Sequence, residues 1–244
     1  MPSPRFLVDT EPAVGEALPL PQAVAHHALR VLRLRIGAPI TLFTGRGGEY
    51  AARLRVDGER AWAVTERFEP IERESPLPVT LVQAWVATDK LDWIVEKAVE
   101  LGVMALCFVP AARSVVRLDD SRREKRLHRL GEIAVAACCQ SGRNRVPRVA
   151  AAETLQLGLE RARQDGATFL LLDPESPRGL SGAAPFPGPL VLAVGPEGGF
   201  DDDERNLAVR LGYRAVRLGP RTLRTETAGI AALAALQALA GDLQ

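Results

Sequence analysis

Residues Leu190–Ala240 read LVLAVGPEGGFDDDERNLAVRLGYRAVRLGPRTLRTETAGIAALAALQALA. Two short apolar segments within them, Val191–Val194 and Ala215–Leu218, each continue into a Gly-Pro loop, and each loop precedes a predicted helix. In an open α/β sheet, ligands bind outside the carboxyl ends of the strands, where such loops gather. The sequence therefore predicts an α/β fold in which two ligand loops lie close together.

The first loop, Gly195–Phe200, is followed by three aspartates and a glutamate. Asp201 and Glu204 have the spacing of a capping box, in which each side chain accepts a hydrogen bond from the other residue's backbone. These carboxylates would repel a phosphate, and the chain has neither a G-x-G-x-x-G nor a G-x-x-x-x-G-K-[ST] motif. The loop suits a neutral or cationic ligand, although glycines that merely permit a tight turn explain it equally well.

The second loop, Gly219–Thr227, precedes Ala228–Ala240, which is almost entirely Ala, Leu and Ile. A helix that is apolar on nearly every face is buried, and polar groups at its start need partners. Capping by Thr225 or Thr227 and a local Arg–Glu pair explain part of this turn. The number of donors and acceptors gathered there favours a ligand site.

The N-terminal part of the chain has short elements separated by glycine-containing turns. The predicted elements are strands at Arg5–Val8, Ile40–Thr44, Tyr50–Val56 and Trp62–Phe68, and a helix at Val24–Leu34. This pattern is typical of a small, mostly β barrel. Glu69–Pro78 contains three prolines and four charged residues, which predicts a linker. We therefore expect domains at residues 1–72 and 73–244.

In the second part of the chain, apolar strands alternate with helices. The predicted strands are Val79–Ala87, Val103–Val109 and Thr168–Leu172, and helices are predicted from Asp89 to Gly102, at Ser121–Ser141 and at Thr154–Gln164. Together with the two strand-loop-helix units, this alternation predicts a mainly parallel sheet covered by helices. Pro174–Pro189 is longer than an ordinary connection, and such loops are usually functional or mobile.

Charge is unevenly distributed, although the net charge is only +1. Ten Lys or Arg and four acids lie between Arg113 and Arg148, whereas nine Arg and twelve acids follow from Val149 onward. The asymmetry is compatible with a basic patch for an anionic partner. For Arg122–Arg129 alone, a solvated helix face is the better interpretation.

Cys107, Cys138 and Cys139 are too few and too poorly spaced for a disulfide framework or a zinc site. His26 and His27 have no partner at metal-ligand spacing, so no metal is expected. The sequence contains neither a signal peptide nor a run long enough to span a membrane. We expect a soluble, cytoplasmic protein.

Several stretches together resemble one family. VGPEGGF and LGPRTLRTETA look like the two cofactor loops of the SPOUT superfamily of RNA methyltransferases. AHHALRVLRLRIG, EKAVELGV and QSGRNRVP match, in order, the RsmE family, which methylates N3 of one uridine in 16S ribosomal RNA. The resemblance implies a PUA-like RNA-binding β-barrel, a SPOUT domain with a trefoil knot, a homodimer, S-adenosylmethionine as cofactor and the small ribosomal subunit as partner.

The resemblance also implies site residues. The implied cofactor-binding residues are Leu171, Leu172, Val194, Gly195, Pro196, Glu197, Gly198, Gly199, Leu218, Gly219, Leu223, Arg224, Thr225, Thr227 and Ala228, with the backbone of Leu218–Leu223 included. Arg224 is the expected catalytic cation, oriented by Glu226, and Arg143 is a second expected substrate contact. Asp173 or Glu175 is a candidate to balance the sulfonium or accept a proton. The implied RNA-binding residues are Arg5, Arg30, Arg33, Arg143 and Arg145.

Three alternatives stay open. One is another SPOUT enzyme that acts on transfer RNA or on a ribose 2′-hydroxyl. The second is a non-catalytic RNA-binding or ribosome-assembly protein, whose glycine loops we would expect to be degraded. The third and weakest is a dinucleotide-binding enzyme, because its fingerprint is absent.

Overall fold

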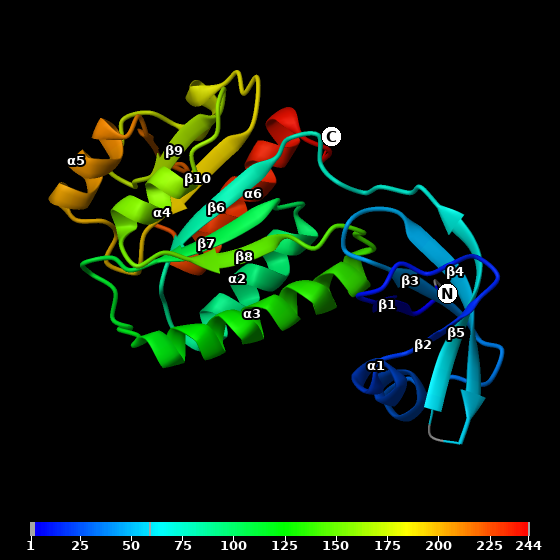
Figure 1. The fold of residues 1–244 in the computed structure, drawn as a ribbon. Coiled ribbons are helices and arrows are strands. Elements are labelled where there is room, and N and C mark those ends of the chain that lie inside the picture. The colour runs from blue at the N-terminus through cyan, green and yellow to red at the C-terminus, as the bar shows by residue number, and fades with distance from the viewer. Residues whose placement is uncertain (1–2, 59, 244) are drawn as a thin grey trace. The chain divides into compact units, whose positions relative to one another are not determined.

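The computed structural model describes residues 3–58 and 60–243. Contacts divide the chain into two compact units. The first contains the residues up to Glu74 together with Cys138–Val146, and the second contains Ser75–Ala137 and the chain from Pro147 onward. The first unit thus includes a segment that a single division of the chain near residue 72 does not describe. Figure 1 labels the elements of both units.

The first unit is built on a five-stranded sheet. Its strands are, in spatial order, β1 (Arg5–Leu7), β3 (Pro39–Phe43), β4 (Glu49–Asp57), β5 (Arg60–Glu69) and β2 (Ala17–Pro19). β1 pairs in parallel with β3, and the other neighbours are antiparallel. Apolar side chains that alternate along these strands, such as Leu42, Leu54 and Ala63, form its core. The predicted β character of this part is confirmed.

The helix predicted at Val24–Leu34 is shorter and less regular than expected. The structure has α1 (Gln22–His26) followed by a π-helical turn, η1 (His27–Val31). Arg33 then adopts a φ of 53°. Many helices end with a residue in this left-handed conformation, and that residue is usually glycine. The Leu34 amide closes this end by bonding the Ala28 carbonyl.

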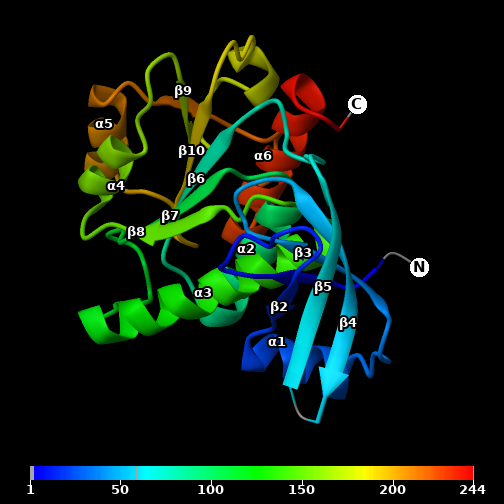
Figure 2. The same ribbon diagram turned by 45° about the vertical axis from the view of Figure 1, so that its right-hand side comes forward.

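The second unit is organised around a six-stranded sheet. Its spatial order is β11 (Arg214–Val216), β9 (Thr168–Leu172), β10 (Leu190–Val194), β6 (Val79–Ala84), β7 (Ala105–Val109) and β8 (Arg148–Ala151). Each of these neighbouring pairs is parallel. All the carboxyl ends therefore lie along one edge, and Figure 2 shows the strands side by side. The predicted parallel sheet is confirmed; β8 and β2, both short edge strands, were not predicted.

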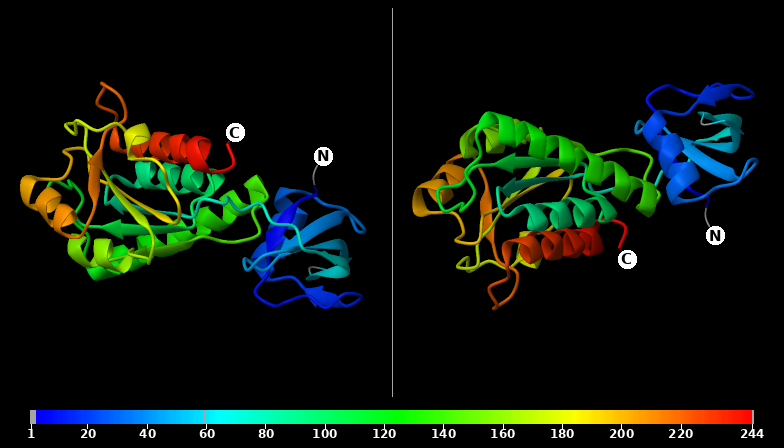
Figure 3. Two further views of the ribbon diagram at one scale, coloured as in Figure 1. Left: turned by 90° about the horizontal axis from the view of Figure 1, so that it is seen from above. Right: turned by 90° about the horizontal axis from the view of Figure 1, so that it is seen from below.

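Helices cover both faces of this sheet. The helices are α2 (Thr88–Glu100), α3 (Asp120–Ser141), α4 (Leu155–Arg161), α5 (Asp202–Arg210) and α6 (Thr225–Ala240), and Leu180–Ala183 forms a 3₁₀ turn, η2, in the long loop. α6 packs against α2, β6 and β10, and Figure 3 shows α2 and α6 together in both views. Leu155 and Leu159 of α4 and Ala208 of α5 join one core cluster with strand residues.

Among the described residues, no helix is both long and apolar enough to cross a membrane. The trefoil knot that the resemblance implies stays a prediction.

The close packing of α4 gives a stability test. A Cβ added at Gly158 would lie 2.2 Å from Cγ1 of the buried Val109. We expect Gly158→Ala to lower the free energy of unfolding of the second unit by about 1–3 kcal/mol through overpacking. The matched control is Gly131→Ala in α3, where the added Cβ meets nothing within 4 Å and should stabilise the helix by up to about 1 kcal/mol. Urea denaturation of both variants measures the difference, and equal effects would contradict the prediction.

Candidate cofactor pocket

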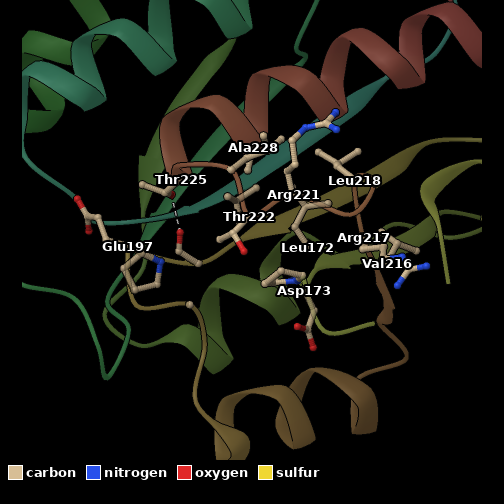
Figure 4. A pocket seen from close by; sticks show the side chains of 17 residues that line it. Leu172, Asp173, Glu197, Val216, Arg217, Leu218, Arg221, Thr222, Thr225 and Ala228 are labelled. Atoms are coloured by element: carbon tan, nitrogen blue, oxygen red, sulfur yellow. Dashed lines mark hydrogen bonds between the residues drawn. The ribbon is translucent and has the colours of Figure 1, made fainter. Parts of the chain in front are cut away.

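A pocket lies at the carboxyl ends of β9, β10 and β11 (Figure 4). It encloses about 620 Å³ including space open to solvent, within the range of small-molecule sites. Its lining residues are Leu172, Asp173, Pro174, Val194, Gly195, Pro196, Glu197, Gly199, Val216, Arg217, Leu218, Gly219, Arg221, Thr222, Leu223, Thr225 and Ala228. Both Gly-Pro loops therefore contribute to one cavity, as the sequence predicts.

The first loop turns too tightly for a side chain at its start. A Cβ on Gly195 would lie 3.0 Å from the Phe200 nitrogen and 3.1 Å from the Gly199 carbonyl carbon. Gly199 has a φ of +69°, and its amide bonds the Pro196 carbonyl at 2.9 Å. The predicted capping box then starts α5: Asp201 and Glu204 accept each other's backbone amides at 2.9 Å. These two carboxylates are thus occupied within the helix end.

Thr225 joins the second loop to the first. Its hydroxyl donates to the Gly195 carbonyl at 2.6 Å and accepts from Nε2 of Gln83 at 3.1 Å, as the dashed line in Figure 4 shows for the first bond. The N-cap of α6 is Arg224, which makes no side-chain capping bond. The prediction that Thr225 or Thr227 caps this helix is therefore wrong. The buried Thr225 hydroxyl bonds the Gly195 carbonyl, 30 positions away, instead.

Lys90 of α2 connects the two loops electrostatically. Its Nζ lies 2.8 Å from Oε1 of Glu197 and 3.6 Å from Oε2 of Glu226. The hydrogen bond to Glu197 raises the pKa of Lys90. Burial acts to raise the pKa of Glu197, but the hydrogen bonds from Lys90 and from its own backbone outweigh burial and lower it. The expected pairing of Glu226 with Arg224 is wrong, since the cation beside Glu226 comes from another helix.

Charges of both signs line the pocket. Asp173 lies deep, with a side chain only 12% exposed, and its nearest cation is Arg205, 4.0 Å away. Figure 4 shows Glu197 on one side of the pocket and Arg217 and Arg221 on the other. A ligand that carries both positive and negative groups would find complementary partners here.

Residues 140–146 of the segment QSGRNRVP lie in the first unit, where Arg143 and Arg145 pair with carboxylates of the same unit. Arg143, with a side chain 3% exposed, donates from Nε to Glu74 at 3.1 Å and from Nη2 to the same carboxylate. Asn144 and Arg5 both bond Glu49, and Arg145 bonds Glu72 at 3.3 Å. A direct RNA contact by Arg5 or Arg143 would have to break these bonds.

The carboxylate of Glu49 is the centre of that network. Burial acts to raise its pKa, but hydrogen bonds from Arg73, Arg5 and Asn144 outweigh burial and lower it. Arg30 and Arg33, the other predicted RNA ligands, are exposed.

Known proteins resemble the chain over its whole length. Residues 73–237 match the family model described as an RNA methyltransferase domain, and residues 20–65 match an RNA methyltransferase PUA domain. Ribosomal RNA small subunit methyltransferase E of Mycobacterium bovis is 36% identical, with 96% of this chain and 91% of the relative covered. The chain belongs to the ribosomal RNA small subunit methyltransferase E family.

Two solved structures extend the likeness of this methyltransferase to three dimensions. The family member from Neisseria gonorrhoeae, bound to S-adenosylmethionine, is 39% identical with a TM-score of 0.92, covering 99% of this chain and all of the other. A putative methyltransferase from Legionella pneumophila, also in complex with that cofactor, is 33% identical with a TM-score of 0.94 and full coverage of both chains.

Most predicted cofactor residues line the pocket of the methyltransferase. Leu171, Gly198, Arg224 and Thr227 do not. Leu171 points into the core because successive strand residues face opposite sides, and Arg224 and Thr227 are exposed. The prediction missed Pro174, Val216 and Arg217. The only feature of the sequence that could have identified these three residues is their position at the ends of the strands β9 and β11.

The described part of the methyltransferase contains no group of three His, Cys, Asp or Glu placed to hold a metal. The three cysteines are free, and burial raises the pKa of Cys138 to about 12. These thiols are therefore protonated and unreactive at neutral pH.

The Lys90 bridge can be tested by substitution. Lys90→Met should weaken S-adenosylmethionine binding about tenfold, because the two loops lose their shared cation and two carboxylates are left facing each other. Lys97→Met on the same helix is the control, since within residues 3–58 and 60–243 Lys97 pairs only with Glu96 and Glu100. Calorimetric titration measures both, and unchanged affinity in Lys90→Met would contradict the prediction.

The arginines of QSGRNRVP should differ in their effect on stability. Arg143→Ala leaves Glu74 without its buried partner, which we expect to cost about 3–5 kcal/mol. Arg145→Ala removes a pair whose arginine is 55% exposed, which should cost less than about 1 kcal/mol. Urea unfolding compares the two variants; a larger loss for Arg145→Ala would contradict the assignment of Arg143 as an internal residue.

Proposed function

We propose that this methyltransferase transfers a methyl group from S-adenosylmethionine to N3 of a uridine in 16S ribosomal RNA. The observation that carries the proposal is the single pocket formed by both Gly-Pro loops and the end of β9. Relatives at 39% and 33% identity whose structures hold S-adenosylmethionine share the fold that presents these loops.

The pocket residues fit the cofactor chemically. S-adenosylmethionine has an apolar-faced adenine, a cationic sulfonium and a charged amino acid end. Leu172, Val194 and Leu218 offer apolar surface, and Asp173 and Glu197 supply negative charge. Added Cβ atoms at Gly199 and Gly219 would meet nothing within 4 Å, so bare backbone borders the open space. The carboxylate of Asp173 suits the sulfonium, and Arg217 and Arg221 suit the carboxylate of the amino acid end.

The bound cofactor supplies an electrophilic methyl group. The protein must then hold the uracil in line with that methyl and make its N3 proton acidic. Arg224 suits this second task, because its exposed guanidinium forms no ion pair among the described residues and it lies between the pocket residues Leu223 and Thr225. A cation beside O2 or O4 of the uracil stabilises the charge that develops when N3 loses its proton.

Thr225 and Lys90 keep this arrangement in place. The Thr225 hydroxyl fixes the start of α6 on the first loop, and Lys90 restrains Glu226 and Glu197. Glu226 therefore acts through Lys90 in our proposal. No metal or covalent enzyme intermediate is required by this chemistry.

The remaining parts of the proposal concern the assembly. We assign residues 1–72 to PUA-like RNA binding and residues 73–244 to catalysis by a knotted SPOUT domain. We expect the protein in the cytoplasm, because ribosomal RNA is modified where ribosomes assemble. We also expect a homodimer. Apolar side chains exposed on the second unit support a dimer. They are Trp93, Met104, Leu239 and Leu243.

Substitution of Arg224 tests the mechanism. Arg224→Ala should leave the dissociation constant for S-adenosylmethionine within about threefold and lower kcat by about 10²-fold or more, because the oxyanion loses its cation. Arg221→Ala, which removes a pocket-lining charge, should instead weaken cofactor binding. Titration calorimetry and quantification of N3-methyluridine in 16S RNA separate the two effects. Full activity of Arg224→Ala would exclude the assigned role.

A further inference from the structure

A second hollow lies on the same edge of the six-stranded sheet. It follows the carboxyl ends of β6, β7 and β8, whereas the cofactor pocket follows those of β9, β10 and β11. It has about 1000 Å³ of space, including open solvent, and is bordered by Trp85, Ser114, Arg117, Arg123, Glu153 and Glu204, among others. The function derived above gives this hollow no role.

The charged side chains of the hollow differ in their partners. Both oxygens of Glu204 are occupied, since they accept from the amides of Ala112 and Asp201. Glu153 pairs with Arg161 at 3.2 Å and Arg123 pairs with Asp120 at 2.7 Å. Arg117 is exposed and forms neither an ion pair nor a hydrogen bond within the described parts of the chain. Arg117 is therefore a guanidinium of the lining without an ion-pair partner in the described chain, while Glu204 keeps its negative charge because its hydrogen-bond donors are neutral amides.

The hollow also has a polar group for a neutral part of a ligand. The Ser114 Oγ is buried and has no hydrogen-bond partner among the residues that the structure describes. A buried hydroxyl without a partner is uncommon and offers one donor and two acceptor positions. Trp85, only 3% exposed and stacked on Phe108 with 5.0 Å between ring centroids, borders the hollow from the core. A base that hydrogen-bonds Ser114 and is joined to an anion beside Arg117 matches this combination.

One hydrogen bond joins the edge of the hollow to the cofactor loop. Arg113 donates from Nη1 to the Gly198 carbonyl at 2.9 Å, and the neighbouring Ala112 amide donates to Glu204 of α5 at 2.7 Å. Arg113 thus contacts the first Gly-Pro loop, and its neighbours Ala112 and Ser114 border the hollow. A strand of RNA that presents its uracil at the cofactor pocket would continue along the same sheet edge.

We propose that this hollow binds a nucleotide that neighbours the methylated uridine, with Arg117 on its phosphate and Ser114 on its base. The inference rests on the proposed function and adds to it a second contact site for the same RNA. Arg117 is then a determinant of RNA affinity, distinct from the residues that hold the cofactor.

The test compares two arginines that carry the same charge. Arg117→Ala removes a cation that borders the hollow. Arg122→Ala removes a cation of α3 that does not border the hollow and whose side chain is 75% exposed. Filter binding of a 16S RNA transcript is measured between about 50 and 200 mM salt. Log affinity falls as log salt rises, and each lost phosphate contact makes this negative slope less steep by about 0.7 to 0.9. Cofactor titration checks that each variant is folded.

We expect Arg117→Ala to weaken RNA binding about tenfold and to make the salt dependence less steep by about one unit of slope. Its cofactor affinity should be unchanged, and Arg122→Ala should bind RNA about as well as the wild type. Ser114→Ala should weaken binding without changing the slope, because the hydroxyl is uncharged. Equal effects of Arg117→Ala and Arg122→Ala would overturn the proposal, since only the bulk field would then matter. Weakened binding to assembled small subunits but not to free RNA would also overturn it, in favour of a protein contact.

These outcomes are separable from a failure of the proposed function. Absence of N3-methyluridine with wild-type protein would contradict the methylation, whereas the binding comparison does not depend on turnover.

Discussion

The hydrogen bond from the Thr225 hydroxyl to the Gly195 carbonyl, 2.6 Å long, joins the two halves of the cofactor pocket. Gln83, fully buried on β6, donates to the same hydroxyl. Three elements far apart in the chain therefore meet at one buried oxygen, where an unmade bond is costly. Gly229, one turn along α6, lies beside Gln83 and Val194, and an added Cβ there would meet both at 3.6 Å, an ordinary van der Waals contact.

The surrounding charges follow from this meeting point. Once α6 begins beside the first loop, Glu226 and Glu197 lie near each other and need a shared cation, which α2 supplies through Lys90. Carboxylates close to a pocket would disfavour a phosphate-rich ligand, and they agree with a sulfonium. The electrostatics of the pocket are thus a consequence of helix placement as well as of composition.

Arginine illustrates how one residue type is used in two ways. Arg5 and Arg143 are enclosed among carboxylates of the first unit, where a charge must be paired to be tolerated. Arg117 and Arg224 are exposed, and neither has an ion-pair partner in the described chain. The sequence motif around Arg143 suggested RNA contact, but a basic residue in a motif is equally compatible with an internal pair. Only the positions of Glu74 and Glu49 distinguish the two.

Local sequence was sufficient for the features that depend on near neighbours. The Asp201–Glu204 capping box, the strand Thr168–Leu172, the tight turn at Gly195 and the strand-loop-helix order all follow from residues a few positions apart, because backbone geometry and side-chain reach decide them. The short edge strands β2 and β8 were missed, since each pairs on one side only and has a weak pattern. Tertiary structure alone decided that Thr225 bonds Gly195, that Lys90 lies beside Glu226 and that Arg143 pairs with Glu74. These contacts join residues 30 to 136 positions apart, and no local periodicity encodes which side chains strand order and helix packing will bring together.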